Sequence, residues 1–153
     1  MNRQKPDESA IDTIQVGQHT LFKKTVSGTD IMLYAGLSGD FSPLYMDEVF
    51  AAETIFSSRT VHPMLLFSMA GGAIHRLLPL GVDTISRSFQ TVTPVFVNET
   101  VTVIAEVKSI DRGQKQVTLS IHCYNQKDDL VMKGTSIEYL GFSGTTIRND
   151  TKR

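Results

Sequence analysis

The segment PMLLFSMAGGAIHRLL, residues 63–78, restricts the possible folds of this chain more than any other segment. Pro63 fits the first position of a helix, where its missing N–H has no partner to lose. Apolar side chains then occur almost all round the helix, and Pro79 and Gly81 favour an end just after it. A helix that is apolar all round must be buried, so we expect it at the centre of the fold.

Two glycines, Gly71 and Gly72, lie in the middle of this segment. Each glycine costs roughly 1 kcal/mol relative to alanine in a helix interior. We therefore expect another element to pack closely against the helix backbone at this point. His75 and Arg76 follow, and we expect them at the wetter end of the helix.

Alternating apolar and polar residues predict one strand before this helix and four after it. The predicted strands lie within 19–27, 84–97, 99–110, 115–125 and 129–142. The sequences DRGQ and NQKDD between the last three are typical of hairpin turns. Consecutive strands joined by such turns pair in antiparallel fashion.

Two shorter helices are predicted between the first strand and the apolar helix. The first covers 28–39, with Thr29 or Asp30 as its cap and Gly39 at its end. The second lies within 46–56 and begins with two carboxylates, which suit the dipole of a helix start. Three of its residues can face inward: Val49, Phe50 and Ala52.

These elements predict an α+β fold, an antiparallel sheet wrapped around a long central helix. We expect a single domain over residues 13–142, with flexible ends at 1–12 and 143–153. The net charge is −1, with 15 Lys and Arg against 16 Asp and Glu, so no overall basic field attracts nucleic acid or an anionic membrane. The polar N-terminal segment has no apolar signal, which predicts a cytoplasmic protein.

Neither a disulfide nor a metal site is predicted. Cys123 is the only cysteine, which excludes an internal disulfide, and its alternating surroundings predict a buried strand residue. His19 and His122 have no ligand-type residues at metal spacing around them.

The segment GDFSPLYMDEVFA, residues 39–51, places two acidic residues, a proline turn and a tyrosine between two apolar stretches. With the later HPM at 62–64 and PVF at 94–96, it resembles the signature of the MaoC-like, R-specific enoyl-CoA hydratases, which have the hot-dog fold. That signature runs Gly-Asp-x-Asn-Pro-x-His-x-Asp, then His-Gly-Met, then Pro-Val-Phe. The resemblance covers most of residues 20–140.

The resemblance implies a tight dimer whose sheets join, with the acyl chain of a thioester in a tunnel near the central helix. In such enzymes an Asp and a His act on one water, which adds to an enoyl thioester or leaves in reverse. The glycine of His-Gly-Met donates its N–H to the thioester oxygen. No cofactor is implied, because CoA or an acyl-carrier thioester is the substrate.

Three positions of that machinery differ in this chain. Asp40 is kept, but Tyr45 stands at the His position and Ser42 at the Asn position. Phenol has a reference pKa near 10, so a tyrosine is a poor base at neutral pH, although it can donate a hydrogen bond. Pro63 replaces the glycine and has no N–H to donate, which leaves the N–H of Met64 as a substitute.

We therefore predict Asp40 and Tyr45 as catalytic residues. The predicted substrate-binding residues are Ser42, Pro43, His62, Pro63, Met64 and Gly72. Structural roles stay open for three of these residues: a turn residue at Asp40, a packed aromatic at Tyr45 and a helix cap at His62. Thr91 and Val92 stand where the family often has Phe and a basic residue.

Three functions fit these residues. The first is an enzyme that adds water, or another small nucleophile, to a 2-enoyl thioester of CoA or a carrier protein. The second is a hot-dog thioesterase in which Asp40 activates water. The third is a non-catalytic acyl-binding subunit beside a similar chain that keeps the Asp and His. The expected assembly is a homodimer or a heterodimer with a similar chain.

Overall fold

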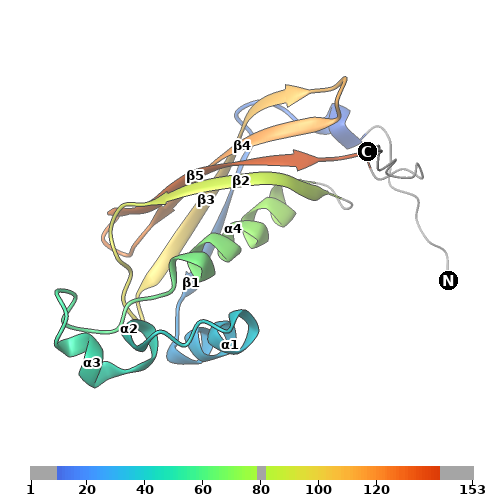
Figure 1. Cartoon of the computed structure of the whole chain (residues 1–153). Helices are drawn as coiled ribbons and strands as arrows, with labels where there is room; N and C mark the ends of the chain where they lie inside the picture. The colour runs from blue at the N-terminus through green and yellow to red at the C-terminus, as the bar shows by residue number, and fades with distance from the viewer. Residues whose placement is uncertain (1–9, 79–81, 142–153) are drawn as a thin grey trace, which may run out of the picture.

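A curved antiparallel sheet lies against one long helix in the computed structural model, which describes residues 10–78 and 82–141 (Figure 1). The sheet has five strands in the order β1-β3-β4-β5-β2. The strands are β1 (His19–Thr25), β2 (Asp83–Thr91), β3 (Thr100–Asp111), β4 (Gln116–Tyr124) and β5 (Leu130–Tyr139). The helical segments are η1 (Ala10–Thr13), α1 (Gly28–Ser38), α2 (Pro43–Met46), α3 (Glu48–Ala52) and α4 (Pro63–Leu77). The predicted α+β architecture is confirmed.

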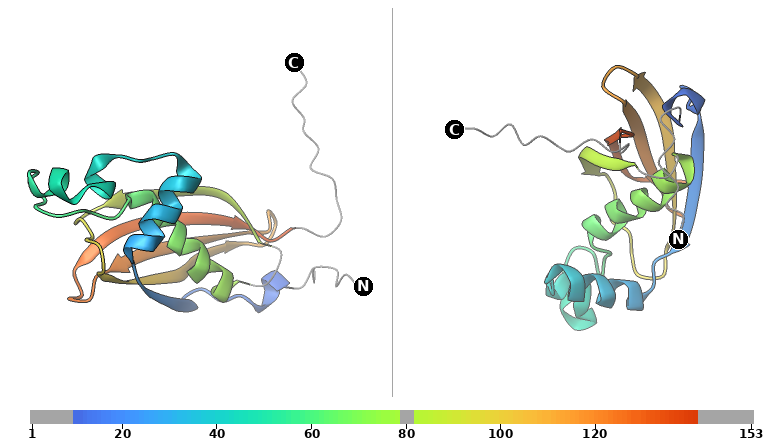
Figure 2. Two further views of the ribbon diagram at one scale, coloured as in Figure 1. Left: turned by 90° about the horizontal axis from the view of Figure 1, so that it is seen from below. Right: turned by 90° about the vertical axis from the view of Figure 1, so that its right-hand side faces the viewer.

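The long helix α4 packs one face on the inner surface of the sheet (Figure 2). Its buried residues are Leu66, Met69, Ala70, Ala73, Ile74 and Leu77. The opposite face is not covered within this chain, since Met64, Ser68, His75 and Arg76 are exposed. The expectation that α4 is buried all round is therefore wrong for the single chain, because the sheet reaches only one side of it.

The two glycines of α4 do have close neighbours, as predicted. A Cβ added at Gly71 would lie 3.7 Å from Nη1 of Arg87, and one at Gly72 would lie 3.8 Å from the ring of Phe22. These are ordinary contact distances, so the glycines bring β2 and β1 side chains close to the helix backbone. Arg76 also covers the Phe22 ring, with its guanidinium carbon 4.5 Å from the ring centroid.

Helix α1 is capped by Ser27 rather than by the predicted Thr29 or Asp30. The Ser27 Oγ accepts the N–H of Asp30 at 3.2 Å, and the Asp30 carboxylate accepts the N–H of Ser27 at 2.8 Å. Burial alone raises the pKa of Asp30, but its hydrogen bonds with Ser27 and Lys24 outweigh this and lower it. The predicted end at Gly39 is confirmed, and its φ of 77° is one that glycine adopts readily.

The region after α1 differs from the prediction in two ways. The single turn α2 was not predicted, and in α3 the three residues expected to face inward, Val49, Phe50 and Ala52, are exposed while Ala51 is buried. A five-residue helix presents only one turn to the protein, so its inward face contains fewer residues than the apolar sequence suggests. The predicted start is confirmed, since Asp47 accepts the N–H groups of Val49 and Phe50 at 2.9 and 3.1 Å.

Other boundaries also differ from the expected ones. β2 ends at Thr91 instead of continuing to 97, because Pro94 cannot donate to a strand ladder. Ile11 and Ile14 belong to the core, so the packed region begins before residue 13. The predicted helix stop at Pro79 and Gly81 and the predicted tail at 143–153 lie outside the described residues.

The buried position of Cys123 is confirmed, and burial raises the pKa of its thiol to about 12.

Ser27→Ala is expected to lower the free energy of unfolding by about 1 kcal/mol, because it removes the cap of α1. Urea denaturation measures this difference. Thr29→Ala, an exposed change in the same first turn, is the matched control and should have a smaller effect. Equal losses in the two variants would contradict the role of Ser27 as the cap.

Candidate functional site

Asp40 lies in the turn between α1 and α2, where its carboxylate is fixed by the local backbone. Its N–H donates to Ser38 Oγ at 3.2 Å, and its Oδ1 accepts the N–H of Ser42 at 3.2 Å. Half of the Asp40 side chain, 50%, is exposed. The carboxylate is thus held in place and still accessible to water.

His62 joins this turn to the start of α4. Its side chain is 1% exposed, and its Nε2 donates to the backbone oxygen of Asp40 at 3.0 Å. The same nitrogen lies 4.0 Å from Asp40 Oδ2. The ring packs against Tyr45 and Tyr34, with centroid distances of 4.0 and 5.0 Å. His62 therefore positions both predicted catalytic residues, Asp40 and Tyr45, relative to α4.

Tyr45 is held close to Asp40, a proximity that the sequence could not show. Burial raises the pKa of the Tyr45 phenol, and the negative charge of Asp40 raises it further. The phenol therefore stays protonated through neutral pH and can act as a hydrogen-bond donor. Among the residues that the structure describes, its hydroxyl has no hydrogen-bond partner, so this donor is available.

A largely apolar cavity of about 220 Å³ lies beside Tyr45 and the N-terminus of α4. It is lined by Leu44, Tyr45, Phe56, Thr60, Val61, Pro63, Leu66, Thr91, Val92, Thr93, Pro94 and Val95. The chain segments that form it are α2, the loop before α4, the start of α4, the end of β2 and the 92–95 segment that follows. Such a cavity can hold an apolar chain while a polar group stays near Tyr45.

The first turn of α4 leaves one backbone donor open beside this cavity. The N–H groups of Leu65 and Leu66 both donate to the His62 oxygen, at 3.0 and 3.3 Å. Pro63 has no N–H, and the Met64 N–H has no acceptor among the described residues. Helix N-termini carry a partial positive charge, so the Met64 N–H is placed to bind a partly negative oxygen.

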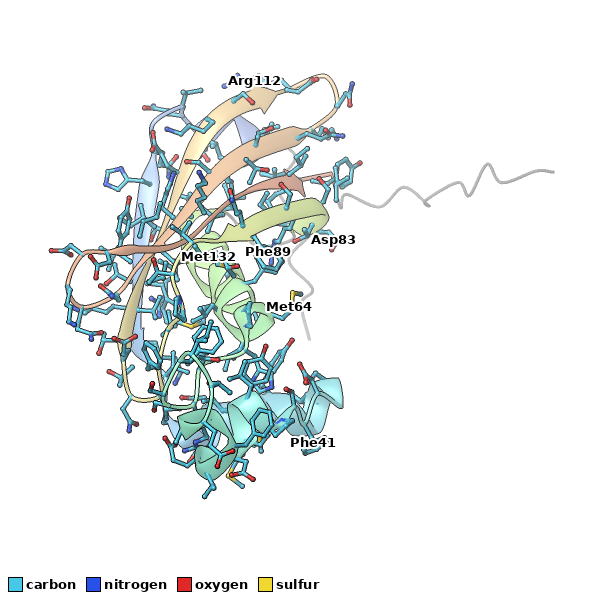
Figure 3. All side chains as sticks on the ribbon, turned by 60° about the vertical axis from the view of Figure 1, so that its left-hand side comes forward. Phe41, Met64, Asp83, Phe89, Arg112 and Met132 are labelled. Atoms are coloured by element: carbon cyan, nitrogen blue, oxygen red, sulfur yellow. The ribbon has the colours of Figure 1, made fainter. Side chains whose placement is uncertain are left out.

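The structure groups most, but not all, of the predicted site residues. Six lie around the start of α4: Asp40, Ser42, Tyr45, His62, Pro63 and Met64. Pro43 is exposed at the first position of α2. Gly72 is separate, because nine residues of helix span roughly 13 Å and it contacts Phe22 instead. Figure 3 shows Met64 at the end of α4 that faces the short helices.

Sequence reasoning missed Tyr34 and most of the cavity lining. Nothing in the sequence of α1 indicates the contact of Tyr34 with His62. The lining residues Thr60, Val61 and Val95 are brought together by the pairing of Val61 N–H with the Val95 oxygen at 2.7 Å. Some lining residues did have a sequence signal: Thr91 and Val92 stand where the family often has other residue types, and Pro94 and Val95 belong to the PVF motif.

In residues 10–78 and 82–141, no group of His, Cys, Asp or Glu could hold a metal ion. Within the same residues, no helix is long and apolar enough to cross a membrane.

His62→Phe is expected to lower the free energy of unfolding by about 1–3 kcal/mol, because the variant loses the hydrogen bond to the Asp40 carbonyl and leaves that oxygen unpaired. Chemical denaturation measures the change. His75→Phe, on the exposed face of the same helix, is the control and should be close to neutral. A neutral His62→Phe variant would show that the hydrogen bond does not hold the turn.

Comparison with known proteins agrees with this geometry. The family profile described as MaoC like domain matches residues 12–125. The (R)-specific enoyl-CoA hydratase of Aeromonas caviae is 32% identical over 126 residues, which cover 82% of this chain and 94% of that protein. The 3-hydroxybutyryl-CoA dehydratase of Methylorubrum extorquens is 27% identical over 127 residues, or 82% of this chain and 80% of its own.

The structural comparison points the same way. The solved (R)-hydratase from A. caviae involved in PHA biosynthesis superimposes with a TM-score of 0.81 and 31% identity, covering 83% of this chain and 97% of that one. Sequence, motif and fold thus agree over the same region. The chain belongs to the MaoC-like family and has its hot-dog fold.

Proposed function

We propose that the protein is an acyl-thioester lyase that adds water, or another small nucleophile, to the double bond of a 2-enoyl-CoA or carrier-protein thioester, or catalyses the reverse reaction. One observation carries this proposal. Tyr45, which feels the charge of Asp40, lines an apolar cavity together with Pro63, and the unpaired N–H of Met64 follows Pro63 at the start of α4. Addition to an enoyl thioester needs a base, an acid and a donor to the thioester oxygen, and each has a candidate here.

Asp40 acts as the general base in this mechanism. Its carboxylate is half exposed, so a water molecule can reach it, and the N–H of Ser42 holds one of its oxygens. The carboxylate takes a proton from water as the water oxygen attacks the β-carbon. His62 does not contact the water in this scheme, because it is buried and donates to the Asp40 backbone oxygen.

Tyr45 acts as the acid or as an oxygen-binding group. Its raised pKa keeps the proton on the phenol, and its free hydroxyl can deliver that proton toward the α-carbon or bind the reacting oxygen. This role differs from that of the family's histidine, which can also accept a proton. The pair Asp40 and Tyr45 divides the two tasks between a fixed base and a fixed acid.

The thioester oxygen gains negative charge as water adds to the β-carbon. The Met64 N–H stabilises this charge in place of the missing donor at Pro63, with help from the dipole of α4. The acyl chain then extends into the cavity between Leu66 and Val95. No cofactor takes part, since CoA or the carrier protein is bound as the substrate.

A second chain completes the assembly in this proposal. β2 is an edge strand whose residues are mostly exposed, so its backbone can pair with another sheet. The uncovered face of α4 also carries the exposed side chain of Met64. We propose a homodimer or a heterodimer with a similar chain, which light scattering distinguishes from a monomer by mass.

The activity test follows the loss of the conjugated thioester absorbance of crotonyl-CoA. Asp40→Asn is expected to reduce turnover by about 10²–10⁴-fold, because the variant has no base. Tyr45→Phe should reduce it by a similar factor through loss of the acid. Tyr124→Phe, on the outer face of the sheet, is the matched control and should keep full activity. Full activity in Tyr45→Phe would refute the role of the phenol.

Two other outcomes would support the remaining functions. Release of free thiol from a saturated acyl-CoA that depends on Asp40 would indicate a thioesterase. Cys123 does not disturb this assay in the folded protein, because it is buried and its pKa is about 12. No turnover of either thioester by this chain alone, with activity only beside a similar chain, would indicate the non-catalytic subunit.

The proline at the start of α4 gives a further prediction. Tyr45→His restores the family's base but leaves Pro63, so its hydration rate should stay below that of the double variant Tyr45→His, Pro63→Gly by about 10²–10³-fold. Steady-state kinetics on crotonyl-CoA measure the ratio. A single Tyr45→His variant as active as the double variant would show that the Met64 N–H alone is sufficient.

A further inference from the structure

A charged cluster around the buried side chains of Ser136 and Glu138 lies on the inner face of the sheet, apart from the proposed catalytic residues. We call it the Arg87–Glu138 cluster, and it consists of Thr84, Arg87, Ser136 and Glu138. Arg87 donates to Glu138 Oε1 at 3.2 Å, to Ser136 Oγ at 2.9 Å and to Thr84 Oγ1 at 2.8 Å. Glu138 also accepts hydrogen bonds from Ser136 and from Thr84, the latter at 2.9 Å. The Glu138 side chain is only 2% exposed.

This cluster is rigid for a physical reason. A buried carboxylate that loses its cation partner is strongly destabilised, so Arg87 cannot leave Glu138 without a large penalty. Arg87 is also packed from the helix side, against Gly71 and with its guanidinium carbon 5.8 Å from the Phe67 ring centroid. The cluster therefore forms a fixed polar wall between α4 and strands β2 and β5.

Two stacked rings lie between this wall and the position of Thr91, a residue that lines the cavity. Phe67 of α4 and Phe89 of β2 have ring centroids 4.4 Å apart and an interplanar angle of 25°. Figure 3 shows Phe89 on β2 beside α4. The cavity lining includes Leu66, which precedes Phe67 in α4, and Thr91, which is two residues after Phe89 in β2.

Strand geometry gives the order of these features along β2. Thr91, Phe89 and Arg87 pair with alternate residues of β5, so their side chains project to the same face of the sheet. Alternate residues of a strand are roughly 6–7 Å apart. Thus the cavity, the stacked rings and the charged cluster follow one another along the inner face, in that order.

We propose that the Phe67–Phe89 stack, backed by the Arg87–Glu138 cluster, is the end wall of the acyl cavity and restricts the substrate to thioesters of short acyl chains. This inference rests on the proposed function. A longer chain must first displace the two rings and then bring methylene groups against a buried ion pair. Apolar groups cannot replace the hydrogen bonds of that pair, so the path ends at the stack.

The test compares crotonyl-CoA with trans-2-decenoyl-CoA in the wild type and in Phe89→Ala. The wild type is expected to prefer crotonyl-CoA in kcat/KM. Phe89→Ala should shift the ratio toward decenoyl-CoA by about tenfold or more, since pocket volume changes of this kind discriminate substrates by such factors. Phe22→Ala, an aromatic truncation beside α4 but away from the cavity, is the control and should leave the ratio unchanged.

A second variant tests the cluster itself. Arg87→Met combined with Glu138→Met removes both charges together, so no buried charge is left unpaired. In the Phe89→Ala background it should raise the decenoyl preference further. A folded triple variant with the same ratio as Phe89→Ala would show that the cluster does not limit the chain.

Binding measurements separate this inference from the proposed function. Isothermal titration with butyryl-CoA and decanoyl-CoA needs no turnover, so it works even if the protein adds no water. Tighter binding of butyryl-CoA by the wild type, with a shift toward decanoyl-CoA in Phe89→Ala, supports the end wall. Equal binding of both thioesters by the wild type, binding of neither, or an unchanged ratio in a folded Phe89→Ala protein overturns it.

Discussion

Burial of one face of α4 against the sheet is the interaction on which the rest of this structure depends. Aliphatic side chains of the helix, such as Leu66 and Ile74, meet inward-facing valines and leucines of β3 and β4 in one core. A fully buried side chain of this size contributes about 1.5–3 kcal/mol. This packing sets the direction of α4 and so places its first turn beside β2 and the 92–97 segment. The cavity and the open N–H of Met64 are consequences of that placement.

His62 links the turn that contains Asp40 to the packed helix α4. Asp40 sits in the short loop between α1 and α2, and half of its side chain is exposed. The hydrogen bond from His62 to the Asp40 backbone, together with the ring contact to Tyr45, ties the loop to the rigid helix. An active site needs such support, because small displacements of catalytic groups reduce rates strongly. The residue that resembles a simple helix cap in the sequence is therefore a positioning residue in the structure.

Tyr45 replaces the histidine of the family's catalytic pair, and Pro63 replaces the glycine whose N–H binds the thioester oxygen. The structure offers a substitute group for each of these two functions. Burial and the charge of Asp40 raise the pKa of the phenol, so it is suited to donate rather than to accept a proton. The proline removes one N–H but leaves the next, and the N–H groups that follow are already paired. The proposed chemistry thus depends on a base, an acid and one backbone donor, each with a separate residue.

The sequence by itself determined the elements whose signals are local. Alternation predicted the strands, Pro63 the start of α4, Gly39 the end of α1, and the acidic turn with its later histidine indicated the family. Only the tertiary structure decided which face of α4 is buried, that His62 reaches Asp40 across 22 positions, and that Arg87 pairs with Glu138 across 51. Capping, turn formation and periodicity depend on neighbours within a few residues. Contacts between distant side chains depend on how whole elements pack, and no local pattern contains that information.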